Sequence, residues 1–203
     1  MNVYIDSNFV LELALKQQQA AAANQIMYWG DSGKISIVCP ALVLTEPLSK
    51  MNYQRVERGR LALSLKQYSL QLARSGEHFT AVDKIEEVLH YFDALDGKES
   101  DETQRICRRL IERSRVLPLD VETMDLAHGI VRNYGTELTD ALVLAAIFAD
   151  LGRLRQAGRL SQSFFISRDT GFQKAKNELK EDLCTFIASF DNAAKAIQAT
   201  LQS

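Results

Sequence analysis

The chain has 203 residues, of which 46% are hydrophobic and 25% charged, and its formal net charge is −2. This is the composition of a globular protein, and the length suits one domain with elaborations. Cys39, Cys107 and Cys184 are odd in number and widely spaced, which argues against a disulfide framework or a zinc site. We recognise no signal peptide and no apolar stretch that could span a bilayer, so we expect a cytoplasmic protein without a membrane partner.

The first eight residues predict the start of an α/β fold. Val3, Tyr4 and Ile5 form a β-prone run, and Asp6 follows immediately before residues that favour turns. In an α/β protein, ligands bind where the carboxyl ends of the strands meet. Asp6 is therefore a candidate ligand of a divalent metal, although an acid after a strand is often only a helix cap.

The next elements extend this pattern. Residues 8–29 predict two helices or one bent helix, and residues 35–39 predict a buried strand that stops at Pro40. The helix that then begins carries Glu46 in an apolar stretch, where a carboxylate needs a metal or a basic partner such as Lys50. Pro47 follows directly and disfavours regular helix at Glu46, so we expect a kink there.

Residues 56–115 have a different character. Apolar residues recur at helical spacing and no strand pattern occurs, while Ser75-Gly76 and Asp96-Gly97 are turn signals. We therefore predict an insertion of two or three helices within a single domain that spans residues 1–203. The sequence leaves three roles open for the insertion: binding a partner, covering the active site, or pairing two subunits.

Strands and helices alternate again after the insertion. Thr136 or Thr139 is expected to cap an apolar helix over residues 141–151, with Asp140 in its first turn, and Asp169 follows the strand at 163–167. Further strands are predicted at 116–119 and 184–189, and further helices at 121–134, 173–180 and 192–201. The predicted fold is a three-layer α/β/α sandwich with a central parallel sheet of about five strands and a helical insertion.

Four acids are expected at the carboxyl edge of this sheet: Asp6, Glu46, Asp140 and Asp169. A site built from carboxylates alone, without histidine or cysteine, selects Mg²⁺ or Mn²⁺ over zinc. Crowded carboxylates repel one another unless a cation compensates their charge, so the cluster itself argues for a metal.

The sequence resembles the PIN domain, a family of metal-dependent nucleases that includes the VapC-type toxins of toxin–antitoxin pairs. The segments that carry the resemblance occur in the family's order and are residues 3–8, 39–46, 134–141 and 166–172. The resemblance covers about residues 1–55 and 116–190, and the helical insertion makes this chain longer than the compact toxins.

The resemblance implies a Mg²⁺- or Mn²⁺-dependent endoribonuclease that hydrolyses RNA phosphodiester bonds. By it, the four acids are the catalytic and metal-binding residues, and Ser7 and Ser167 are polar residues near the metal. Glu137, three residues before Asp140 on the same helix face, is a candidate additional acid. RNA is the implied substrate, and an antitoxin protein and a homodimer are partners that the resemblance leaves open.

An acidic site requires nearby basic residues to bind RNA. Arg168 and Lys174 lie close to the proposed site in sequence and are the first candidates. A second candidate is the stripe Arg105, Arg109 and Arg113, although Asp101, Glu102 and Glu112 can neutralise it; a third is Arg55, Arg58 and Arg60.

Two other interpretations remain. A phosphoryl-transfer enzyme of the haloacid-dehalogenase type would require a second acid two residues after Asp6, where this chain has Asn8. A catalytically inactive PIN-like module for nucleic-acid binding or protein assembly is the stronger alternative, although all four acids are present.

Overall fold

The computed structural model describes residues 1–75 and 77–202. The chain divides into two compact units. One comprises Met1–Pro47 with Arg105–Ser203, and the other is Leu48–Gln104.

The first unit contains an all-parallel sheet of five strands in the order β3-β2-β1-β4-β5. The strands are β1 (Asn2–Ile5), β2 (Ser36–Pro40), β3 (Arg115–Leu117), β4 (Ser163–Ile166) and β5 (Cys184–Ile187). The central strands are runs of apolar residues because both faces of a parallel sheet are covered by helices. The predicted α/β/α fold is confirmed.

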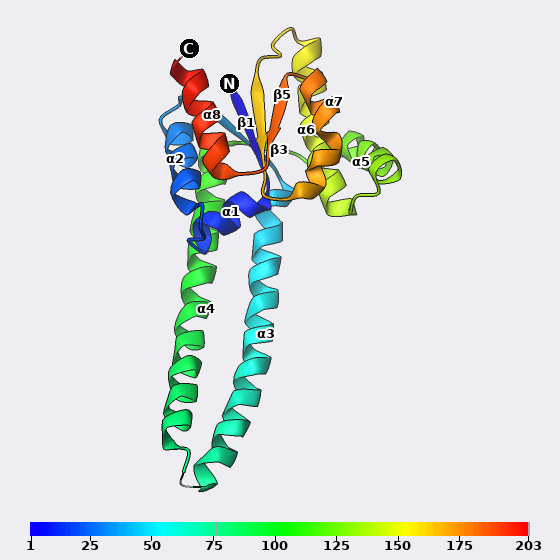
Figure 1. The fold of residues 1–203 in the computed structure, drawn as a ribbon. Helices are drawn as coiled ribbons and strands as arrows, with labels where there is room; N and C mark the ends of the chain where they lie inside the picture. The colour runs from blue at the N-terminus through cyan, green and yellow to red at the C-terminus, as the bar shows by residue number, and fades with distance from the viewer. Residues whose placement is uncertain (76, 203) are drawn as a thin grey trace. The chain divides into compact units, whose positions relative to one another are not determined.

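Helices cover both faces of the sheet (Figure 1). On one face lie α1 (Ser7–Ala14), α2 (Ala20–Asp31) and α8 (Phe190–Gln202). On the other lie α5 (Val121–Tyr134), α6 (Leu138–Gln156) and α7 (Lys176–Glu181), the last preceded by the 3-10 helix η2 (Thr170–Ala175). Of the two alternatives predicted for residues 8–29, two helices or one bent helix, the structure has the two separate helices.

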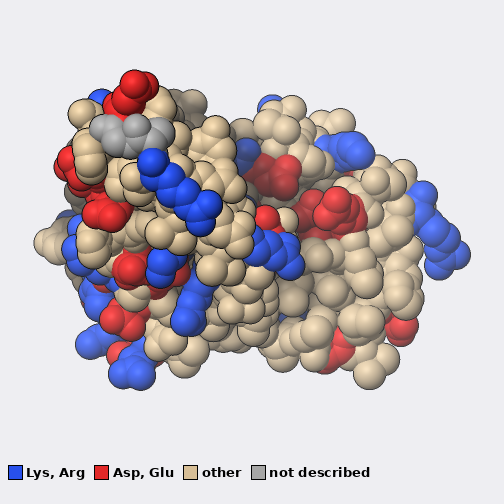
Figure 2. All heavy atoms as spheres, turned by 90° about the horizontal axis from the view of Figure 1, so that it is seen from below, with Lys and Arg blue, Asp and Glu red and all other residues tan. Residues whose placement is uncertain are grey.

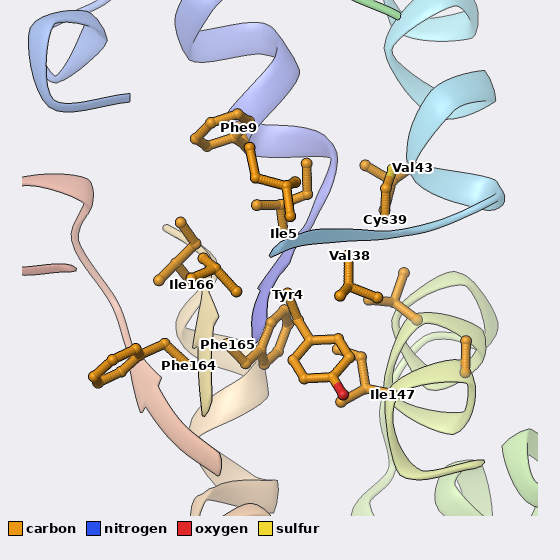
Figure 3. Close-up of a cluster of buried hydrophobic side chains, with 14 of the residues drawn as sticks. Tyr4, Ile5, Phe9, Val38, Cys39, Val43, Ile147, Phe164, Phe165 and Ile166 are labelled. Atoms are coloured by element: carbon orange, nitrogen blue, oxygen red, sulfur yellow. The ribbon is translucent and has the colours of Figure 1, made fainter. Parts of the chain in front are cut away.

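The hydrophobic core follows the central strand β1 (Figure 3). Tyr4 and Ile5 are fully buried, as is Phe165 on the adjacent strand β4. Aromatic edge contacts extend this core on both faces: the ring centroids of Phe9 and Phe190 are 5.6 Å apart, and those of Phe165 and Phe172 are 5.0 Å apart. The carboxyl ends of β1 and β4 are therefore held in a closely packed environment.

The second unit consists of the greater part of two long helices, α3 (Leu42–Leu72) and α4 (Phe79–Arg113). The 3-10 helix η1 (Ala73–Ser75) follows α3. The turn predicted at Asp96-Gly97 is wrong, because α4 continues through both residues. Gly76 of the other predicted turn lies outside the described residues. Pro47 is inside α3 and does not end it.

The start of α6 also differs from expectation. Glu137, and not Thr136 or Thr139, is the N-cap residue, and its side chain makes no capping hydrogen bond. Asp140 lies in the first turn as predicted. No helix in residues 1–75 and 77–202 is both long and apolar enough to cross a membrane.

Candidate functional site

The candidate site begins at the junction of β1 and β4. From β1 the chain passes to β2 on one side, whereas β4 lies on the other side, so this is where the strand order reverses. Ligands of open α/β sheets bind at such a reversal, outside the carboxyl ends of the strands. Ile5 is level with Ile166 in the sheet, so Asp6 and Ser167 leave it side by side.

Asp6 caps α1 and is almost completely buried. Its Oδ1 accepts a hydrogen bond from the Asn8 backbone N–H at 3.1 Å, and its Oδ2 accepts one from the Asn8 side-chain amide at 3.1 Å. Burial raises the pKa of Asp6 to about 7, against the lowering effect of its hydrogen bonds, and the negative charge of Glu46 adds to the rise. The carboxylate is thus both a helix cap and a buried acid.

Ser167 connects Asp6 to Asp169. Its buried hydroxyl donates to Asp6 Oδ2 and accepts a hydrogen bond from the Asp169 backbone N–H at 2.8 Å. Asp169 in turn caps η2, with its Oδ1 accepting from the Gly171 N–H at 2.7 Å. Ser167 therefore orients the carboxylate of Asp6 and the backbone of Asp169.

Asp140 and Asp169 approach each other at Gly171. A Cβ atom added at Gly171 would lie 3.0 Å from Asp169 Oδ1 and 3.8 Å from Asp140 Oδ2. Burial raises the pKa of Asp140 to about 6, and the charges of Asp169, Glu137 and Glu46 contribute to the rise. The absence of a side chain at Gly171 leaves room for both carboxylates.

Glu46 is half-buried in α3, and its charge acts on both Asp6 and Asp140. Glu137 is exposed and also acts on Asp140. The four predicted acids are consequently linked, Asp6 to Asp169 through Ser167 and the others by electrostatic repulsion. Ser7 is buried at the start of α1.

Within the described residues, no group of three or more Asp, Glu, His or Cys side chains is arranged to hold a metal ion. The donor set nevertheless fits a hard divalent cation, because it consists of carboxylate oxygens that repel one another, and the pKa values of Asp6 and Asp140 are raised. Mg²⁺ and Mn²⁺ are the ions that such oxygen ligands suit.

Arg168 and Lys174, the basic residues nearest to Asp169 among the predicted RNA contacts, both have partners within the protein. Arg168 forms an ion pair with Glu12 of α1 at 2.6 Å, and 37% of its side chain stays exposed. Lys174 donates to the backbone carbonyl of Tyr134 at 3.0 Å and is exposed. Both remain accessible to a ligand, since neither is buried by its partner.

Of the other basic candidates, Arg109 pairs with Asp31, while Arg105 and Arg113 are exposed. Arg58 pairs with Asp96 and Glu99. Figure 2, seen from the side toward which the strands run in Figure 1, shows acidic side chains at the surface with Lys and Arg beside them.

Sequence reasoning missed two buried acids. Glu12 is fully buried and holds Arg168. Asp150 on α6 is buried and accepts a hydrogen bond from the Tyr4 hydroxyl at 2.7 Å. It also forms a bidentate ion pair with Arg115. Neither acid follows a strand, which is the signal that identified Asp6 and Asp169.

The fold and site together define an α/β protein with a carboxylate-rich edge at the strand-order reversal, an arrangement suited to a divalent metal. The chain belongs to the PIN domain family, whose sequence model matches residues 3–172. The match includes Asp6, Glu46, Asp140 and Asp169, and PIN domains are generally nucleases. Neither the curated proteins nor the solved structures contain a significant match to the sequence.

Proposed function

We propose that this protein is a Mg²⁺- or Mn²⁺-dependent endoribonuclease that hydrolyses RNA phosphodiester bonds. The observation that carries the proposal is the chain of contacts from Asp6 through Ser167 to Asp169, with Asp140 opposite Asp169 at Gly171. It supports a role for these acids as one functional group. Membership of the PIN domain family supports nuclease chemistry at the same place.

Asp6, Glu46, Asp140 and Asp169 would hold the metal. A bound ion of this kind lowers the pKa of a water molecule and offsets phosphate charge during hydrolysis. The chain's own contribution is positional: Asn8 and Ser167 fix the Asp6 carboxylate, and Gly171 leaves space for Asp140 and Asp169. Because the pKa of Asp6 is about 7, metal binding must displace a proton near neutrality and should strengthen as the pH rises.

Arg168 and Lys174 are the proposed RNA contacts, because both are exposed close to Asp169 in the chain. Their existing partners, Glu12 and the Tyr134 carbonyl, fix where the two cations lie. Cys39, Cys107 and Cys184 are unpaired and buried, which suits the reducing cytoplasm. A role as the toxin of a toxin–antitoxin pair would suit this activity, and a small DNA-binding protein encoded beside this chain would support it.

The test is cleavage of total RNA with Mn²⁺ by the wild type and by the Asp6→Asn and Asp140→Asn variants. We expect each variant to lose activity by on the order of 100-fold or more, because the bound ion supplies several kcal/mol of charge stabilisation. Asp125→Asn is the matched control, since Asp125 is an exposed acid on α5 outside the linked group, and it should cleave at the wild-type rate.

Thermal unfolding with and without Mn²⁺ separates an enzyme from an inactive module. A ligand that binds only the folded state raises the unfolding temperature. We expect Mn²⁺ to stabilise the wild type and Asp125→Asn, and to stabilise Asp6→Asn much less. A wild type that neither cleaves RNA nor responds to Mn²⁺ would refute the proposal in favour of a binding or assembly module.

A further inference from the structure

The unit Leu48–Gln104 has too little buried apolar surface for its length. Among its described residues, Met51 is the only hydrophobic side chain that is buried. Its large apolar residues are instead widely exposed, including Leu61, Leu63 and Tyr68 on α3 and Val88 on α4. Exposed apolar surface on this scale marks an interaction site.

Burial and one ion-pair cluster identify the sides on which α3 and α4 pack against each other. On α4, Val82, Ile85, Leu89 and Phe92 are half-buried at alternating three- and four-residue spacing, the spacing of a coiled-coil seam. Arg58 of α3 pairs with Asp96 and Glu99 of α4 at 2.5 and 2.7 Å. The helices thus run antiparallel, with Arg58 level with residues 96–99.

The two sides that flank this seam differ. One side has a cleft of about 560 Å³ whose α4 wall is formed by Glu86, Leu89, His90 and Asp93, of which only the seam residue Leu89 is apolar. Leu61 and Tyr68 of α3 and Val88 and Leu95 of α4 recur at seven-residue spacing and flank the seam on the opposite side. We call these four residues the apolar face. The register set by Arg58 places Leu61 level with Leu95, and Tyr68 level with Val88.

We propose that the apolar face binds the apolar face of a second copy of this chain, so that two hairpins form a four-helix bundle. The face is self-complementary in charge as well as in hydrophobicity. Glu57, which pairs with Arg60 of the same helix at 2.5 Å, borders it on α3, and Lys98 borders it on α4. Glu57 and Lys98 both lie at the level of the Arg58 ion pairs. A second copy related by a two-fold axis along the hairpin sets Glu57 of each copy against Lys98 of the other.

The alternative two-fold axis, across the hairpin, is disfavoured. It would set α3 against α3 and α4 against α4 in opposite directions, so that Lys84 of one copy lies near Lys98 of the other. Like charges in opposition weaken an interface. The axis along the hairpin avoids this repulsion and pairs Tyr68 with Val88 and Leu61 with Leu95 across the interface.

Sedimentation equilibrium of the full-length protein tests the proposal. We expect a dimer of twice the 22.8 kDa chain mass, and we expect Leu61→Glu and Val88→Glu to be monomers because each places a charge in the apolar interface. Leu63→Glu is the matched control, since Leu63 is exposed on the same helix but lines the cleft on the other side. It should remain a dimer, and circular dichroism should show unchanged helix content in all three.

Two charge reversals test the orientation of the copies. Glu57→Lys and Lys98→Glu should each raise the dimer dissociation constant by about tenfold, because each sets like charges opposite one another. Mixing the two variant chains should restore the wild-type dissociation constant, since the reversed charge of each chain then faces an opposite charge on the other. A monomeric wild type, dissociation by Leu63→Glu equal to that by Leu61→Glu, or no recovery on mixing would overturn the proposal.

Discussion

The hydroxyl of Ser167 donates a hydrogen bond to the carboxylate of Asp6, although 161 positions separate the two residues in the chain. Parallel pairing of β1 with β4 produces this contact, because both residues follow strands that end at the same level. Ser167 also accepts from the Asp169 N–H. The position of Asp6 relative to Asp169 therefore depends on a single buried side chain.

Replacing Ser167 should affect both stability and the Asp6 carboxyl group. We expect Ser167→Ala to lower the free energy of unfolding by about 1–3 kcal/mol, because buried polar groups lose their partner. It should also raise the pKa of Asp6 further, since the Ser167 hydrogen bond lowers it. Urea unfolding and NMR titration of the Asp6 carboxyl carbon measure these effects. Ser163→Ala, which alters a buried serine at the start of β4, should leave the Asp6 titration unchanged.

Stability without metal should fall as the pH rises through the weakly acidic range. The pKa of Asp6 is about 7 and that of Asp140 about 6, against 3.8 for an ordinary Asp, chiefly because of burial. Between about pH 4 and 7 the folded state therefore holds more protons than the unfolded state, and the free energy of unfolding decreases with pH. Asp6→Asn should flatten this decrease in urea unfolding with EDTA. Equal slopes for Asp6→Asn and wild type would contradict the expectation, and Asp125→Asn serves as the control.

Substitution of Asn for either of two acids on α6, Asp140 and Asp150, should change the free energy of unfolding in opposite directions. Asp140→Asn should raise the metal-free unfolding free energy by up to about 1 kcal/mol, because it removes repulsion from Asp169, Glu137 and Glu46 that solvent screens in part. Asp150→Asn should lower it by about 2 kcal/mol, because it weakens the bonds from Tyr4 and Arg115. Chemical denaturation of both variants in the presence of EDTA measures these changes. A change of the same sign in both variants would contradict the assignment of Asp140 to a repulsive environment and Asp150 to an attractive one.

Much of the fold could be predicted because a covered parallel sheet imposes apolar strands. The segments at 3–5, 35–39 and 163–167 carried that signal directly, and all three are strands within a residue of their expected limits. Two of the site acids were found by the same logic, since Asp6 and Asp169 follow strands that end at one edge. That Asp169 acts electrostatically on Asp140, and Glu46 on both Asp6 and Asp140, required the structure.

The features that sequence reasoning missed depend on contacts between distant residues. Tyr4 and Asp150 are 146 positions apart, and nothing local to either indicates the hydrogen bond that joins them. The turn predicted at Asp96-Gly97 failed for a related reason. A glycine inside a helix costs only about 1 kcal/mol, and the ion pair of Asp96 with Arg58 on the neighbouring helix stabilises the continued α4.

Gly171 offers a test of the site that leaves every acid in place. A Cβ atom there would lie 3.0 Å from Asp169 Oδ1, which is closer than ordinary contact, so the Asp169 carboxylate must leave its present position beside Asp140. We expect Gly171→Ala to weaken Mn²⁺ binding and RNA cleavage by about 10–100-fold, the loss typical of displaced ligand support, with little change in the unfolding temperature. Gly152→Ala is the control, because a Cβ there meets nothing within 4 Å and alanine favours the α6 helix. It should retain full activity, and equal activity in the two variants would show that the position of Asp169 does not matter.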